Sequence, residues 1–227
     1  GHTLTVQLSA YSFPVIVGRK MYPRGVLAEL SAFLKGPKTI KDFEDEGCNY
    51  WKHWATEDGT INVDYGNKWI NWGGVDQLQA VIDSLQADPH SRRHMINAWD
   101  PTNLDKLSLP CCHYGYQFYV TADNKLDMIW LQRSVDLMIG LPSDIILAAA
   151  LNMLVAQLAG LTPGRLTLQL GDCHVYQQHV FGALEYLKRL EDHSRSPWSY
   201  PNYTFNRSIR HYTDFSADTI KIGNGPA

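Results

Sequence analysis

The sequence is poor in cysteine and has no excess of charge of either sign. Its four cysteines are Cys48, Cys111, Cys112 and Cys173. They form no CxxC pair and no Cys/His spacing typical of zinc, which argues against a structural metal site. Cys111 and Cys112 are adjacent, which is a poor geometry for a disulfide. The formal net charge of -3 gives no general attraction to nucleic acid or anionic membranes, so phosphate recognition must come from local arginines.

The sequence also lacks a convincing membrane segment. Its longest apolar stretch, residues 145–161, is short for a span and is interrupted by Asn152 and Gln157. A helix buried on all sides in the domain centre is the better interpretation. Because we find no apolar signal segment near the N-terminus, we predict a cytoplasmic protein in a reducing compartment, or in the host cytoplasm if the protein is viral.

Length and composition predict one globular domain. The chain has 227 residues, of which 44% are hydrophobic and 19% charged, and this is enough for a large core. We find no repeats, low-complexity segments or convincing linkers. A single α/β domain over residues 1–227 is therefore expected.

Hydrophobic periodicity and turn residues predict the elements of this domain. Expected helices cover residues 24–34, 40–46, 75–86, 145–161 and 176–191. Expected strands cover residues 4–8, 94–99, 116–122, 125–132 and 166–170. Asp144 is expected just before the long apolar helix. After His193 the chain is rich in Ser, Pro and Asn and gives no clear pattern.

Aromatic residues are concentrated in one Gly- and Asn-containing stretch. Its members are Trp51, Trp54, Tyr65, Trp69 and Trp72. They could fill an edge of the core, or they could form a wall for a flat ligand. The residues alone leave both interpretations open.

Chemistry-bearing residues form an ordered set in the second half of the chain. Cys112-His113 is followed by the strings 132–136 (QRSVD), 140–144 (GLPSD) and 171–176 (GDCHVY). A buried structural cysteine is the usual case. If Arg133 lies close to Cys112, its guanidinium would favour the thiolate, which is the nucleophilic form.

Taken together, these strings resemble the thymidylate synthase superfamily, and the resemblance runs from Phe13-Pro14 to about Tyr212. It implies an α/β (α+β) domain with a large mixed sheet packed by helices, which pairs sheet to sheet in a homodimer. It also implies 5,10-methylenetetrahydrofolate as co-substrate and a pyrimidine nucleotide as substrate, with no metal, membrane or nucleic acid required. Cys111 departs from the family pattern because it stands where proline is usual, and the family's early phosphate-binding arginine loop has no clear counterpart.

The resemblance assigns the nucleotide contacts. Arg92 and Arg93, in the string 88–93 (DPHSRR), would reach across the homodimer interface to the phosphate of the neighbouring active site. Residues of the 132–136 string, Gln132, Arg133 and Ser134 among them, would contact the substrate. His174 and Tyr176 would hold the sugar hydroxyl. Read without the resemblance, Arg92-Arg93 could be a solvated pair at a helix end, and His174 a hydrogen-bonded core histidine.

The resemblance likewise assigns the catalytic and folate residues. Cys112 would be the nucleophile, with Arg133 beside it, and Tyr65 would assist removal of the C5 proton. Glu29 would be the catalytic glutamate, and an unpaired carboxylate on an apolar helix face is costly without such a role. The implied folate contacts are Trp51, Trp54, Leu109, Asp136 and Gly140.

Asp144 stands where a uracil-specific synthase has asparagine. Cytosine presents an amino donor at N4, from which a carboxylate can accept, whereas an ionised aspartate would face O4 of uracil with no proton to offer. The same change marks the dCMP hydroxymethylases of the superfamily. A helix N-cap would also explain an aspartate at this position.

The prediction is therefore a dCMP 5-hydroxymethyltransferase in which water completes the reaction. Ser134 beside Arg133 resembles the deoxyribonucleotide users of the superfamily, which favours dCMP over CMP. The C-terminal residues 223–227 (GNGPA) do not resemble the hydrophobic tail with which thymidylate synthases close the site against water, which favours hydroxymethyl transfer. Trp51 and Leu109 resemble those of a synthase and keep a dCMP methylase open. A thymidylate synthase acting on dUMP, and a non-catalytic nucleotide- or RNA-binding module, are the further alternatives.

Overall fold

The computed structural model describes residues 1–193 and 201–223. A five-stranded sheet has the order β1-β5-β4-β3-β2. The strands are β1 (His2–Gln7), β2 (Met95–Asn97), β3 (His113–Val120), β4 (Lys125–Asp136) and β5 (Thr162–His174). β4 and β5 are parallel and every other neighbouring pair is antiparallel, so the sheet is mixed, as the resemblance implied.

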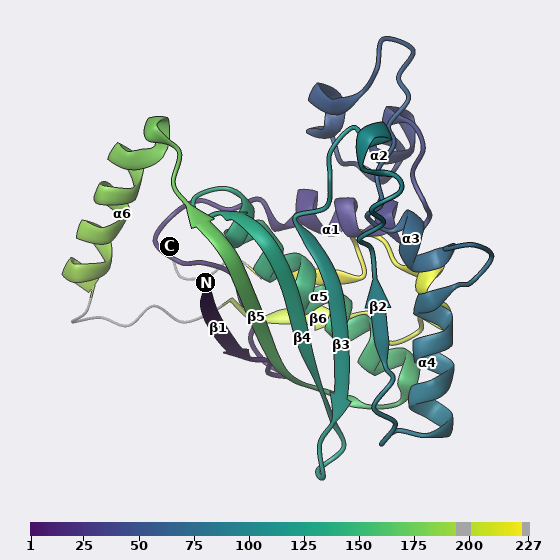
Figure 1. The fold of residues 1–227 in the computed structure, drawn as a ribbon. Coiled ribbons are helices and arrows are strands. Elements are labelled where there is room, and N and C mark those ends of the chain that lie inside the picture. Colours follow the sequence, from purple (N-terminus) through teal and green to yellow (C-terminus); the bar gives the residue numbers. More distant parts are fainter. Residues whose placement is uncertain (194–200, 224–227) are drawn as a thin grey trace.

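The parallel pair requires a crossover connection, and the long helix α5 (Gly140–Ala159) supplies it. This helix is apolar and long enough to cross a membrane, but most of it is buried inside the domain, as expected for a central core helix. α5 and α1 (Pro23–Phe33) lie behind the sheet in Figure 1. Among the described residues, no helix covers the opposite face, towards the viewer.

Shorter elements complete the described chain. The remaining α-helices are α2 (Ile40–Glu46), α3 (Asn67–Ile70), α4 (Gln77–Ala87) and α6 (Val180–His193). Four short 3-10 helices are η1 (Trp51–Trp54), η2 (Leu104–Lys106), η3 (Gln177–His179) and η4 (Tyr212–Asp214). A two-stranded sheet pairs β6 (Tyr203–Phe205) with β7 (Ile220–Ile222). α6 stands away from the main sheet, beyond its β1 edge (Figure 1).

The expected elements are present, and their boundaries differ most at the end of the sheet where β4 and β5 finish. β4 and β5 run on to Asp136 and His174 because they pair with each other through these last residues. α5 begins at Gly140 rather than residue 145, and α6 begins after a 3-10 turn rather than at Tyr176. The sequence pattern missed α3, β6 and β7. The tail beyond Gly223 lies outside the described residues.

Candidate active site

One pocket collects the predicted site residues at the end of the sheet where β4 and β5 finish and β3 begins. α1, the segment from Tyr50 to Tyr65 and the start of α5 form its other walls. All predicted residues except Arg92, Arg93 and Arg133 line it: Glu29, Trp51, Trp54, Tyr65, Leu109, Cys112, Gln132, Ser134, Asp136, Gly140, Asp144, His174 and Tyr176. Segments far apart in sequence thus meet around a single thiol.

Cys112 lies just before the irregular start of β3 and is partly exposed. Its backbone N–H donates to the hydroxyl oxygen of Tyr65, and its carbonyl accepts from the backbone N–H of Arg133 at 2.9 Å. Burial raises the pKa of the Cys112 thiol above its ordinary value, while Tyr65 and Arg133 act in the opposite direction. Arg133 therefore favours the thiolate, as expected, but its effect is smaller than that of burial.

Arg133 holds the loop before Cys112 instead of lining the pocket. Its Nε donates to the carbonyl of Cys111 at 2.8 Å, and one Nη donates to the carbonyl of Pro110 at 3.1 Å. The guanidinium lies 5.3 Å from the ring centroid of Trp99, within cation–π range. The cation is thus fixed beside Cys112 by backbone carbonyls and an aromatic face.

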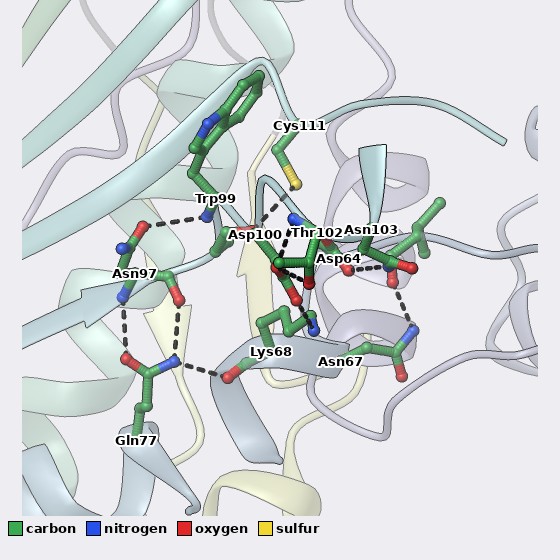
Figure 2. A network of polar contacts seen from close by, with 12 residues as sticks. Asp64, Asn67, Lys68, Gln77, Asn97, Trp99, Asp100, Thr102, Asn103 and Cys111 are labelled. Carbon is green, nitrogen blue, oxygen red and sulfur yellow. Dashed lines mark hydrogen bonds and ion pairs between the residues drawn. The ribbon is translucent and has the colours of Figure 1, made fainter. Parts of the chain in front are cut away.

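A polar network fastens the segment between β2 and β3, which leads to Cys112 (Figure 2). Lys68 of α3 forms an ion pair with Asp100 at 2.5 Å, and Asn103 donates to Asp64 at 2.8 Å. Asp64 directly precedes Tyr65, so the segment that supplies Tyr65 also holds the loop leading to Cys112. The neighbouring Cys111 is buried, and burial raises its thiol pKa strongly, which makes it a poor nucleophile.

Glu29 reaches the pocket from α1. The indole N–H of Trp51 donates to its carboxyl oxygen at 2.7 Å. Burial raises the pKa of Glu29 to about 7, and the hydrogen bonds from Trp51 and Tyr50 oppose that rise. The carboxyl group can therefore exchange a proton near neutral pH.

The aromatic stretch divides between the two interpretations. Trp51 lines the pocket and stacks on Phe43 with ring centroids 4.9 Å apart, and Trp54 and Tyr65 also line the pocket. Trp69 is fully buried in the core. Trp51, Trp54 and Tyr65 are thus placed where they could contact a flat ligand, while Trp69 fills the core.

Asp144 lies inside α5, in contrast to the expectation that it precedes the helix. Ile139 is the N-cap residue, so capping does not explain this aspartate. Gln132 donates from Nε2 to a carboxyl oxygen of Asp144 at 2.7 Å, and Trp130 donates to the Oε1 of Gln132 at 3.0 Å, which fixes the amide orientation. Burial raises the pKa of Asp144 to about 7. Gln132 therefore holds one carboxyl oxygen of Asp144 in place.

His174 and Tyr176 lie at the pocket edge, beyond the end of β5. The His174 side chain retains 29% exposure and lies 3.4 Å from the Asp172 carboxylate, so it is not a core histidine. Its ring centroid is 5.0 Å from that of Tyr176.

Arg92 and Arg93 are exposed in the loop between α4 and β2 and do not contribute to the pocket of their own chain. Four lining residues were missed by the sequence reasoning: Phe33, Tyr50, His113 and Val135. Tyr50 could have been found from its position beside Trp51. His113 is buried, and burial lowers its pKa to about 3, so it stays neutral. Within residues 1–193 and 201–223, no group of three or more His, Cys, Asp or Glu residues is arranged so that it could hold a metal ion.

The fold and the pocket define a class of α/β protein in which a thiol, three carboxyl groups and several aromatic side chains line one pocket at the end of a mixed sheet. A family model described as "Thymidylate synthase" matches residues 1–225. A thymidylate synthase of Corynebacterium aurimucosum is 38% identical over 218 residues, covering 94% of this chain and 78% of the relative. The chain therefore belongs to the thymidylate synthase family, whose members are folate-dependent one-carbon transferases acting at C5 of a pyrimidine nucleotide.

Proposed function

We propose that the protein is a dCMP 5-hydroxymethyltransferase that uses 5,10-methylenetetrahydrofolate. The contact between Gln132 and Asp144 carries this proposal. Gln132 holds one carboxyl oxygen in place, so the other oxygen of Asp144 can accept a hydrogen bond from the N4 amino group of cytosine. When ionised, Asp144 pairs with N3 once that atom is protonated, whereas it offers O4 of uracil no proton.

The chemistry follows from groups around Cys112. Addition of its thiolate to C6 makes C5 nucleophilic towards the one-carbon unit, and Arg133 partly offsets the cost of forming the thiolate. Tyr65, or a water it holds, assists removal of the C5 proton. Charge that develops on the N3/C4 side of the ring is stabilised by Asp144 and, through water, by Glu29. Loss of tetrahydrofolate leaves an exocyclic methylene, to which water adds.

The contacts of the two substrates are proposed from the same pocket. Ser134 and Gln132 would contact the nucleotide, and His174 with Tyr176 would hold its sugar hydroxyl. The folate would lie against Trp51, Trp54, Leu109, Asp136 and Gly140. We further propose a cytoplasmic homodimer that pairs through the face of the sheet without a helix, in which Arg92 and Arg93 bind the phosphate in the partner's site.

Two observations favour other outcomes. Trp51 is almost fully buried and, like Leu109, lines the pocket, so both could shield the methylene from water and favour a hydride-dependent dCMP methylase. The name of the similar bacterial protein, thymidylate synthase, favours dUMP as substrate. A non-catalytic nucleotide-binding module is disfavoured by the presence of Cys112, Glu29 and Tyr65 in one pocket.

Product masses separate these functions. The purified protein is incubated with methylenetetrahydrofolate and either dCMP or dUMP, and the nucleotides are analysed by mass spectrometry. A gain of one CH2O unit on dCMP alone is the expected result. A gain of CH2 on dCMP would identify a methylase, and dUMP as the only substrate would overturn the role given to Asp144.

The nucleophile is tested by substitution. We expect Cys112→Ala to abolish turnover while nucleotide binding, measured by calorimetry, is largely kept. Cys111→Ala is the matched control, because the thiol of Cys111 is buried and does not line the pocket. Turnover that survives in Cys112→Ala would contradict the proposed mechanism.

A further inference from the structure

Tyr50 lies in the pocket and has no role in the assignments above. Its ring shares the pocket lining with Glu29, Cys112 and Asp144 and is 41% exposed. Its hydroxyl donates to the carbonyl of Gly25 at 3.3 Å. Gly25 precedes Glu29 by about one helical turn in α1, so the hydroxyl lies at the end of the pocket that holds the Glu29 carboxyl group.

The hydroxyl of Tyr50 has several protein partners and still has capacity to accept a further hydrogen bond. Its bond to Gly25 is long for an O–H···O hydrogen bond. Glu29 and Cys48 are also hydrogen-bonding partners of this side chain. While the hydroxyl donates to one of these groups, its oxygen can still accept a hydrogen bond from water.

The surroundings make this end suitable for one ordered water. Trp51 already occupies one carboxyl oxygen of Glu29. Phe33, Trp54 and Leu109, which also line the pocket, offer water no comparable acceptor. A water beside Glu29 can therefore give one hydrogen bond to the carboxylate and the other to Tyr50, which leaves its oxygen lone pair free to attack.

We propose that Tyr50 and Glu29 together hold the water that adds to the exocyclic methylene, with Tyr50 as a positioning residue for the hydration step. This inference rests on the proposed hydroxymethyltransferase function. The water oxygen bonds to the methylene carbon and its proton passes to the Glu29 carboxylate. The electron pair of the exocyclic double bond moves into the ring and then expels the Cys112 thiolate from C6, which restores the 5,6 double bond. The step requires no oxidant or reductant.

The protonation states suit these roles. Burial raises the pKa of Glu29 to about 7, so its carboxylate form is populated near neutral pH and is basic enough to accept a proton. Burial also raises the pKa of Tyr50 well above its ordinary value. Tyr50 therefore stays protonated and orients the water without removing a proton from it.

The test separates hydration from the steps before it. Tyr50→Phe is compared with the unaltered protein in single-turnover reactions with dCMP tritiated at C5 and methylenetetrahydrofolate. Release of tritium reports one-carbon transfer, and mass spectrometry reports hydroxymethyl-dCMP. We expect tritium release in the first turnover to be kept within about twofold, while hydroxymethyl-dCMP formation falls at least about tenfold, the lower range for loss of a positioned proton-transfer partner.

Two further variants make the result specific. Tyr22→Phe is the matched control, because its exposed ring also packs beside Gly25 but does not line the pocket; it should behave like the unaltered protein. Tyr50→His keeps a hydrogen-bonding group at the same position and should recover part of the lost hydration.

Equal loss of tritium release and product in Tyr50→Phe would overturn the inference, because it would mean that Tyr50 supports the pocket as a whole. An unchanged ratio of product to released tritium would overturn it as well. If the unaltered protein itself forms no hydroxymethyl-dCMP, the proposed function has failed, and that failure is visible before any variant is made.

Discussion

At the scale of single residues, the two pocket carboxyl groups with a raised pKa are the most informative feature. Glu29 and Asp144 both have a pKa raised by burial to about 7. A neutral Asp144 can donate as well as accept and so matches either pyrimidine base, whereas the ionised form matches only cytosine with N3 protonated. Base discrimination should therefore depend on the protonation of Asp144.

We expect the preference for dCMP over dUMP to increase as pH rises through about 7, because deprotonation removes the only donor that Asp144 could offer to O4 of uracil. The measurement is the ratio of kcat/KM for the two nucleotides across this range. In Asp144→Asn the preference should reverse towards dUMP and lose this pH dependence.

A pH-independent ratio in the unaltered protein, or an unchanged preference in Asp144→Asn, would contradict this view of Asp144. Gln157→Glu is a matched control for a charge change elsewhere on α5, outside the pocket. It should leave the ratio as it is.

At the scale of elements, the turn that joins Tyr65 to α3 depends on a glycine. Gly66 has a φ of +66°, and a Cβ at this position would lie 2.0 Å from the carbonyl oxygen of Phe33. Phe33 in turn stacks on Tyr65, with ring centroids 5.3 Å apart. The end of α1 therefore packs directly against the backbone of Gly66, with no side chain between them. Tyr65, which contacts Cys112, lies next to this close approach.

We expect Gly66→Ala to lower both stability and activity, because Phe33 or Tyr65 must move to accept the methyl group. Gly74→Ala is the control: its φ is +89° and its Cβ would meet nothing within 4 Å, so only backbone strain of about 1 kcal/mol is expected. Denaturant unfolding and turnover measurements compare the two. Equal losses in both variants would show that the close approach at Gly66 has no consequence.

At the scale of the whole molecule, the buried carboxyl groups link folding to pH. The pKa of Asp144 is about 7 in the folded protein against an ordinary value of 3.8. Between these values the folded chain binds a proton that the unfolded chain releases, so this group makes the unfolding free energy fall as pH rises. His113, whose folded pKa is lowered to about 3, acts in the opposite direction.

Comparison with Asp144→Asn isolates the carboxyl group, because His113 is present in both proteins. We expect the variant to gain stability relative to the unaltered protein as pH rises from about 4 to about 7, with no further gain above that range. Urea unfolding at several pH values measures the difference. A difference that stays constant over the whole range would contradict the raised pKa.

The proposed dimer gives a second prediction at this scale. Cys112→Ala subunits and subunits carrying both Arg92→Ala and Arg93→Ala should each be inactive. Unfolding and refolding them together should restore about a quarter of normal activity, because each mixed dimer would keep one intact site. Mixing two preparations of the Cys112→Ala protein is the control. No recovery from the mixed subunits would mean that these arginines do not act across an interface.

Several properties of this protein follow from its sequence alone. Local periodicity predicted α1 and α4, since a helix face is defined by residues three and four apart. The strings around Cys112, Arg133 and His174 indicated the family, which the family model and the bacterial relative confirm. The kinds of chemical group in the pocket were likewise readable before the fold was known.

Only the tertiary structure decided how these groups are arranged and charged. The full length of β4 and β5 depends on pairing between residues nearly forty positions apart, such as Asp136 and His174, which no local pattern encodes. The thiol of Cys112 and the carboxyls of Glu29 and Asp144 have pKa values set mainly by burial, and burial is created by residues distant in sequence. For the same reason the structure placed Tyr50 in the pocket and Arg133 beside it, because both positions depend on long-range packing.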